Sequence, residues 1–291
     1  MGGKYIFKNI LGSFVFDQQF KLVEKGSEEK LLKKYKNLNK PEDKELDRIL
    51  EFFRDKKYFS EFYEKNIQLT KKDIKASVSN DLLIIQTING IEELDKVANM
   101  LAKRLREWYS LYNPELSHDI EDHKKFVEEV LKKVKRKSAM GAELSEKDLK
   151  LILELANKLK IVYEFREHLE KYLESLVKQV CPNITAITGA LIAAKLLEHA
   201  GSLKKLVLFP ASTIQLLGAE KALFRHMKTK AKAPKYGVLF QHPLIQKNKK
   251  KLHGKIARTL ADKISLAAKI DYFKGEFIGD KLRKEIEDKF K

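Results

Sequence analysis

Residues 145–180 read SEKDLKLILELANKLKIVYEFREHLEKYLESLVKQV, and this stretch decides the kind of fold that the chain can adopt. Ser145 is a suitable N-cap for a helix, and Asp148 follows it three residues later. Apolar residues then recur at steps of three and four through most of the stretch, which predicts one long amphipathic helix. They are Ile152, Leu155, Leu159, Val162, Leu169, Leu173, Leu176 and Val180. So long an apolar stripe needs another helix to pack against.

Two further helical patterns precede this stretch. One begins at Asn80 or Asp81 and ends at about Asn113, before Pro114, and the other runs from Asp119 to Lys137. Residues 138–142 are the predicted turn, so we expect a long antiparallel coiled-coil hairpin. Such a narrow rod cannot bury its apolar stripe alone, which predicts a homodimer through the coiled coil.

The flanking segments differ from this rod. The N-terminal segment has short β-type runs and then helical patterns, which predicts a small α/β domain; the runs are 5–7, 13–16 and 20–23, and the helices are 28–35 and 43–63. The C-terminal segment predicts an all-helical domain, with helices at 183–199, 212–230 and 253–270 and a basic loop at 228–251. The predicted fold class is mainly α, with domains 1–80, 81–180 and 181–291.

Positive charge is concentrated in the C-terminal domain. Between Glu198 and Asp262 there are fourteen Lys and Arg and one acidic residue, Glu220, while the whole chain carries a formal net charge of +18. Apolar runs interrupt these cations, so the segment is expected to fold and to present a nucleic-acid-binding surface. The alternative is a solvated basic face without a ligand. Rings accompany the charges, with Phe224 expected in the core and three others as candidates to stack on bases: His226, Tyr236 and His242.

Residue types that carry catalysis are not arranged as a site. The glycines are scattered, so no Gly-rich loop for a nucleotide or S-adenosylmethionine is present, and we expect no cofactor. His118 and His123 are five residues apart, which is about 140° around a helix, so they do not easily share a metal ion. Ser117 is instead the predicted N-cap of that helix. Cys181 has no nearby base, so we expect no catalytic residue and no metal site.

Composition also restricts the compartment. The single cysteine, Cys181, excludes an intramolecular disulfide and favours a reducing, intracellular environment. No uncharged apolar run reaches the roughly 18 residues of a membrane span, and no signal peptide is recognisable. We therefore expect a cytoplasmic protein without membrane contact.

The run from Pro210 to His226, PASTIQLLGAEKALFRH, resembles the signature of the Nop domain. That domain occurs in the core proteins of box C/D ribonucleoproteins and in a related spliceosomal factor. Residues 81–86, 105–116 and 236–241 also resemble the family. The short N-terminal domain and the Arg-Glu-Trp-Tyr sequence at 106–109 make the chain most similar to archaeal members.

The resemblance implies a non-catalytic scaffold with three tasks. The N-terminal domain would bind the methyltransferase fibrillarin, and the coiled coil would pair two copies. The C-terminal domain would bind box C/D guide RNA together with a kink-turn-binding ribosomal-type protein. The resemblance implies contacts at Gly218, Ala219, Glu220, Lys221, Arg225 and His226, which we extend to Lys228, Lys230, Lys232, Lys235 and Tyr236.

Other functions stay open at this point. One is an enzyme that modifies RNA, which the missing Gly-rich loop disfavours. Another is a Nop-domain factor of a different RNA–protein machine, or a general nucleic-acid binder. Family members often end in a Lys/Glu-rich tail, which is not found before Lys291, so a shortened C-terminus is also an expectation.

Overall fold

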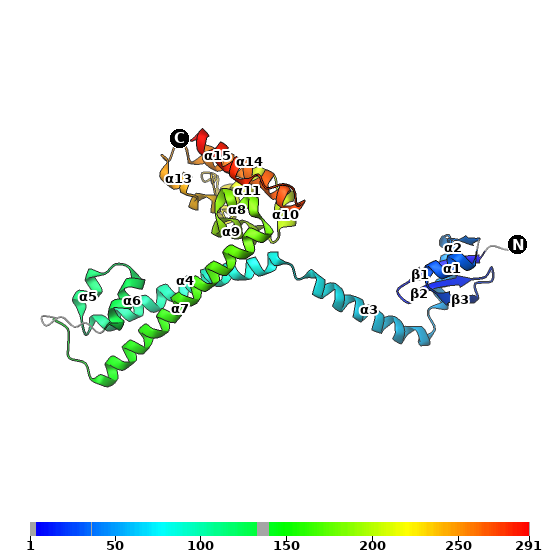
Figure 1. Ribbon diagram of the computed structural model, residues 1–291, viewed down its shortest axis with the longest axis horizontal. Coiled ribbons are helices and arrows are strands. Elements are labelled where there is room, and N and C mark those ends of the chain that lie inside the picture. Colours follow the sequence, from blue (N-terminus) through cyan, green and yellow to red (C-terminus); the bar gives the residue numbers. More distant parts are fainter. Residues whose placement is uncertain (1–3, 36, 133–139, 291) are drawn as a thin grey trace. The chain divides into compact units, whose positions relative to one another are not determined.

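The structure is a computed structural model that describes residues 4–35, 37–132 and 140–290 (Figure 1). The chain divides into two compact units, Met1–Val78 and Ser79–Lys291. The predominantly helical fold class with a small N-terminal sheet is confirmed. Within the described ranges, no helix is long and apolar enough to cross a membrane.

The first unit is built on a four-stranded sheet of order β3-β2-β1-β4. Its strands are β1 (Lys4–Asn9), β2 (Gly12–Phe16), β3 (Leu22–Gly26) and β4 (Leu38–Asn39). The β1–β2 and β2–β3 pairs are antiparallel, and β4 is parallel to β1. The predicted third strand starts two residues late because Phe20 adopts a left-handed φ of 61°.

Three helices complete this unit: α1 (Glu28–Lys34), α2 (Asp43–Phe52) and α3 (Lys56–Ser77). The predicted helix over 43–63 is wrong, because α2 ends at Phe52 and α3 begins after Asp55, which accepts the N–H of Lys57 as its N-cap. The break lets Phe53 turn towards the sheet, where its ring centre lies 4.9 Å from that of Phe14. Aromatic packing therefore overrides the helical pattern.

The second unit begins with the long helix α4 (Asn80–Ser110), which pairs with α7 (Glu146–Val180) (Figure 1). The start of α4 packs against the end of α7, as Ile84 and Ile88 share a buried cluster with Leu173. Ala102 at the other end packs with Ile152. The pair is antiparallel, so the long hairpin is confirmed, with α4 rather than the 119–137 helix as the main partner of α7.

The connection between them contains α5 (Pro114–Asp119) and α6 (His123–Leu131). A helix starting at Asp119 with Ser117 as its N-cap is wrong: Asp122 caps α6 by accepting the N–H of Lys125 at 2.8 Å. Arg106 of α4 holds the intervening segment by donating to the Ser117 and Glu121 carbonyl oxygens, both at 2.8 Å. The end of the predicted 119–137 helix and part of the predicted turn lie outside the described residues.

The C-terminal part consists of short helices around a long one, α14 (His253–Tyr272). The others are α8 (Pro182–Thr188), α9 (Ala190–Ala200), α10 (Leu203–Leu208), α11 (Ala211–Leu216), α12 (Glu220–Thr229), the 3₁₀ turn η1 (Val238–Gln241), α13 (Pro243–Lys247) and α15 (Gly279–Lys289). The helices predicted at 183–199 and 212–230 are each broken at a glycine in the left-handed region, Gly189 (φ 79°) and Gly218 (φ 83°). The segment predicted as a loop over 228–251 contains η1 and α13.

A buried carboxylate joins two of these helices. Asp271 of α14 accepts the backbone N–H groups of Asn183 and Ile184 at 3.0 Å each, and the Asn183 side-chain amide at 2.7 Å. These donors are at the N-terminus of α8, where unpaired N–H groups need an acceptor. Asp271 thus fixes where α8 starts relative to α14.

Candidate nucleic-acid interface

The surface around residues 218–236 begins at a tight turn between α11 and α12. Gly218 donates its N–H to the Glu220 carboxylate at 2.7 Å. A Cβ added at Gly218 would stand 2.6 Å from Cγ2 of Val238 and 3.1 Å from Nε2 of His199. Since φ is also positive, only glycine fits this position without strain. The turn therefore fixes the starting point of α12.

Backbone and side-chain hydrogen bonds hold the segment 235–238 against this turn. Val238 N–H donates to the Leu217 carbonyl at 2.7 Å, and the Gln215 side-chain amide donates to the Lys235 carbonyl at 2.6 Å. Gly237 passes so close that a Cβ there would be 1.8 Å from the Leu217 oxygen. The fold thereby brings Lys235 and Tyr236 beside the start of α12, although they follow its end in sequence.

Helix α12 lies on the surface and has no buried residue. Lys221, Arg225 and Lys228 are exposed and share one face at steps of four and three residues. Beside them, the side chains of Phe224 and Met227 are 60% and 69% exposed. The expectation that Phe224 belongs to the core is wrong. The inner face of α12 is instead made by three partly buried residues, Ala222, Leu223 and His226.

The end of α12 is closed by local contacts. Lys230 adopts a left-handed φ of 55° and donates its N–H to the His226 carbonyl at 2.9 Å. The Nδ1 atom of His226 contacts the Ala231 carbonyl oxygen. This ring therefore orders the turn after α12, while Lys230, Lys232 and Lys235 project into solvent.

The two remaining candidate rings have different environments. Tyr236 is partly buried and stacks on Phe240, with ring centres 4.8 Å apart and an interplanar angle of 10°. His242 is only 7% exposed, and its Nε2 bonds the Ile187 carbonyl at 3.0 Å. Burial lowers the pKa of His242. His242 is a structural residue, and the prediction that it accompanies the basic surface is wrong.

Sequence reasoning missed three contributors to this surface. His199 lies under the turn, with Nδ1 3.6 Å from the Glu220 carboxylate. Met227 adds apolar area beside Phe224, and Phe240 supports Tyr236. The three-residue step from Phe224 to Met227 could have indicated an exposed apolar stripe, but the positions of His199 and Phe240 depend on the tertiary fold.

His123 and Cys181 are the residues that the sequence analysis discussed for metal binding and for catalysis. His123 Nδ1 accepts the Nε–H of Arg106 at 2.9 Å, so this nitrogen is occupied. Cys181 is buried, and desolvation raises the pKa of its thiol. Within the described ranges, no three His, Cys, Asp or Glu side chains are grouped to hold a metal ion.

Comparison with protein families and relatives confirms the resemblance. The family described as Nop, snoRNA binding domain, fibrillarin matches residues 90–139 and 127–291. A NOP5 family protein of Methanocaldococcus jannaschii is 41% identical over 79% of this chain and 63% of its own length. Nucleolar protein 56 of Bos taurus is 36% identical over 76% of this chain and 42% of its own length. The chain thus spans less than two thirds of these relatives.

A solved structure extends the similarity to the N-terminal unit. The crystal structure of a fibrillarin/Nop5p complex contains a chain with a TM-score of 0.50 and 27% identity to this one, over 98% of each chain. The family match covers most of the chain, and the archaeal relative is similar over a still larger part. On these grounds this chain belongs to the Nop family.

Proposed function

We propose that this protein is a non-catalytic core scaffold of a box C/D ribonucleoprotein that guides 2′-O-methylation of RNA. The observation that carries the proposal is similarity over 98% of the chain to a structure of a fibrillarin/Nop5p complex. Fibrillarin would supply the methyl-transfer chemistry, and this chain would hold the enzyme and the guide RNA in position. Its place of action would be the interior of an archaeal cell.

Three parts of the chain would carry the three tasks. Residues 1–80 would bind fibrillarin, residues 81–180 would form a homodimer, and residues 181–291 would bind box C/D guide RNA and the kink-turn-binding ribosomal-type protein. Large exposed apolar side chains on α4 and α7 support the dimer, among them Met100, Ile161 and Phe165, which are 64%, 57% and 51% exposed. Exposed apolar area of this kind is typical of a surface that a partner covers.

The surface of α12 matches a composite RNA–protein ligand. The face of Lys221, Arg225 and Lys228 suits RNA phosphates, which bind cations irrespective of sequence. The adjacent Phe224 and Met227 side chains suit an apolar area on the kink-turn-binding protein. Gly218, Ala219 and Glu220 shape the start of this helix, while Tyr236 and the lysines at 230, 232 and 235 extend the surface.

A gel-shift titration tests this assignment. The probe is a kink-turn RNA at fixed salt, with and without the kink-turn-binding protein already bound. We expect tight binding only to the preloaded RNA, and a loss of at least about tenfold for the double variant Lys221→Glu/Arg225→Glu. Fibrillarin binding, measured by co-purification, should stay unchanged.

The matched control is Lys269→Glu/Lys284→Glu, which makes the same charge change at exposed positions of α14 and α15, outside residues 218–236 and outside the proposed dimer region. Equal weakening by both double variants would mean that only net charge matters. Loss of fibrillarin binding together with RNA binding would contradict the separation of tasks. Equal affinity for the bare RNA, the preloaded RNA and duplex DNA would favour a general nucleic-acid binder.

A further inference from the structure

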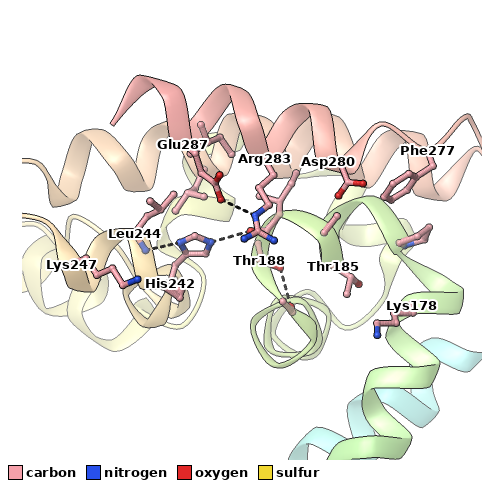
Figure 2. A pocket seen from close by; sticks show the side chains of 17 residues that line it. Lys178, Thr185, Thr188, His242, Leu244, Lys247, Phe277, Asp280, Arg283 and Glu287 are labelled. Carbon is pink, nitrogen blue, oxygen red and sulfur yellow. Dashed lines mark hydrogen bonds and ion pairs between the residues drawn. The ribbon is translucent and has the colours of Figure 1, made fainter. Parts of the chain in front are cut away.

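A groove of about 610 Å³ opens between α8, α13 and α15, and none of its lining residues belongs to the 218–236 surface (Figure 2). This volume is in the range of ligand-binding pockets. Its floor is apolar and includes Ile187, Leu260 and Ile286. Nothing in the proposed scaffold function uses this groove.

The groove is held open by hydrogen bonds inside its own wall. His242 lies between α8 and α13, bonding the Ile187 carbonyl through Nε2 at 3.0 Å and accepting the Leu244 N–H through Nδ1 at 3.2 Å. The Asp271 carboxylate fixes the other end of α8. A preformed wall lowers the ordering cost of binding.

Three of the five charged side chains that line the groove, Lys178, Arg283 and Glu287, are already paired. Arg283 Nε lies 2.8 Å from Glu287, and Lys178 Nζ lies 2.8 Å from Glu174. Lys247 and Asp280 have no ion-pair partner within the part of the chain that the structure describes. Figure 2 shows these two residues on opposite sides of His242. The groove thus has an unpaired cation at one end and an unpaired carboxylate at the other, with His242 and the Arg283–Glu287 pair between them beside the apolar floor (Figure 2).

The groove is also longer than one pocket. A second hollow of about 400 Å³ shares Thr188, Gly189 and Pro243 with the first. Gly189 is exposed there, and a Cβ on it would meet no atom within 4 Å. Two connected hollows around an open backbone position fit an extended chain better than a compact molecule.

We propose that this groove binds a short extended peptide segment of a partner protein. The segment places an acidic residue at Lys247, apolar side chains over the floor, and a Lys or Arg at Asp280. Charge complementarity at both ends fixes which residue binds where. Nucleic acid is disfavoured, because its phosphates would meet the Asp280 carboxylate and an apolar floor.

Methyl NMR on the full-length protein tests this proposal. The probes are the terminally blocked peptides EALFLAK, EALFLAE and KALFLAK, and the reporters are the Ile187 and Ile286 methyl groups, which respond to the phenylalanine ring. We expect EALFLAK to bind the wild-type protein most tightly. Lys247→Glu should weaken EALFLAK by about tenfold and make KALFLAK the preferred peptide, since each end contributes one charge pair.

Lys249→Glu is the matched control, because Lys249 is exposed two residues further along and does not line the groove. This variant should leave the ranking of the three peptides by affinity unchanged. Asp280→Asn provides a second variant, which should remove the preference for EALFLAK over EALFLAE. Thermal unfolding of each variant verifies that it is folded.

Three outcomes would overturn the proposal. Methyl shifts that are absent for every peptide would show an unoccupied groove. If Lys247→Glu does not change the ranking of the three peptides by affinity, they bind elsewhere on the protein. Larger shifts of the same methyl groups by a short A-form RNA duplex would assign the groove to nucleic acid. Because the probes are peptides and the groove is separate from residues 218–236, failure here leaves the scaffold function untouched.

Discussion

The Asp81 carboxylate, in the first turn of α4, accepts the backbone N–H of Leu203 at 2.9 Å across 122 residues of sequence. Leu203 is the first residue of α10, so Asp81 satisfies one of the N–H groups that this helix cannot pair internally. The long helix and the C-terminal helices are thereby joined at one point of the second unit.

Replacing this acceptor should loosen α10. We expect Asp81→Ala to cost about 1 kcal/mol, as for the loss of a helix cap. Hydrogen exchange of the Leu203 amide measures the effect locally and should accelerate several-fold. Asp81→Asn is the control, because it keeps an acceptor oxygen and should show a smaller change. Unaltered exchange in Asp81→Ala would mean that water replaces the carboxylate without cost.

The bonds of Asp271 should contribute more, because they are buried. Asp271→Asn places an NH₂ group where the carboxylate accepts N–H donors, so a donor is left unpaired. We expect a loss of about 2–3 kcal/mol in the free energy of unfolding, measured with urea. Asp262→Asn on the exposed side of the same helix is the matched control and should change stability by less than about 0.5 kcal/mol.

Replacement by alanine should affect the stability of two glycine positions differently. Gly218→Ala forces a Cβ to 2.6 Å from Val238 at a φ of 83°, so it should destabilise the turn by more than about 1 kcal/mol. It should also weaken binding to the preloaded kink-turn RNA, because α12 starts at this turn. Gly254→Ala, near the start of α14, meets no atom closer than 3.7 Å and should be neutral or stabilising. Equal melting temperatures for the two variants would contradict this account.

Stability should fall on mild acidification. Burial lowers the pKa of His242, and burial together with Arg106 lowers the pKa of His123. In the unfolded chain both bind protons with a pKa of about 6.5, so the unfolded state takes up more protons below that pH. The contribution to stability is therefore complete above about pH 6.5 and declines as the pH falls towards the folded-state pKa values.

Urea unfolding between about pH 7.5 and 5.5 measures this decline. His123→Gln and His242→Gln should each flatten the dependence of unfolding free energy on pH, whatever they do to stability at pH 7.5. A slope that stays at the wild-type value in both variants would assign the pH dependence to other groups.

The cations of α12 should contribute to the salt dependence of the RNA-binding constant. If Lys221 and Arg225 each contact a phosphate, each alanine variant should reduce the slope of log K against log salt concentration by about 1. Phe224→Ala should weaken binding of the preloaded RNA without changing this slope, because it removes no charge. A reduced slope for Phe224→Ala would mean that its loss displaces the neighbouring cations.

Local patterns were enough to predict the helical class, the long hairpin and the basic surface. Apolar spacing between Ser145 and Val180 predicted α7, and Ser145 is its N-cap, with its side chain accepting the Asp148 N–H. The pairing of α7 with α4 rather than with 119–137 was not predictable, because all three segments have similar apolar spacing. The greater length of α4 and the break in the other segment at residues 120–122 decide which helix pairs with α7.

The candidate surface at residues 218–236 was likewise predictable from the sequence only in part. Residue types and their sequence neighbours were enough to identify the unopposed cations from Lys221 to Lys235 and the Nop signature. The left-handed turn at Gly218 was not predicted, because the expected helix over 212–230 ran through it. The three-dimensional packing was needed to establish that Phe224 is exposed, that His242 is buried between α8 and α13, and that Asp81 reaches Leu203. These depend on which faces meet, and that is set by packing and by buried hydrogen bonds between segments far apart in the chain.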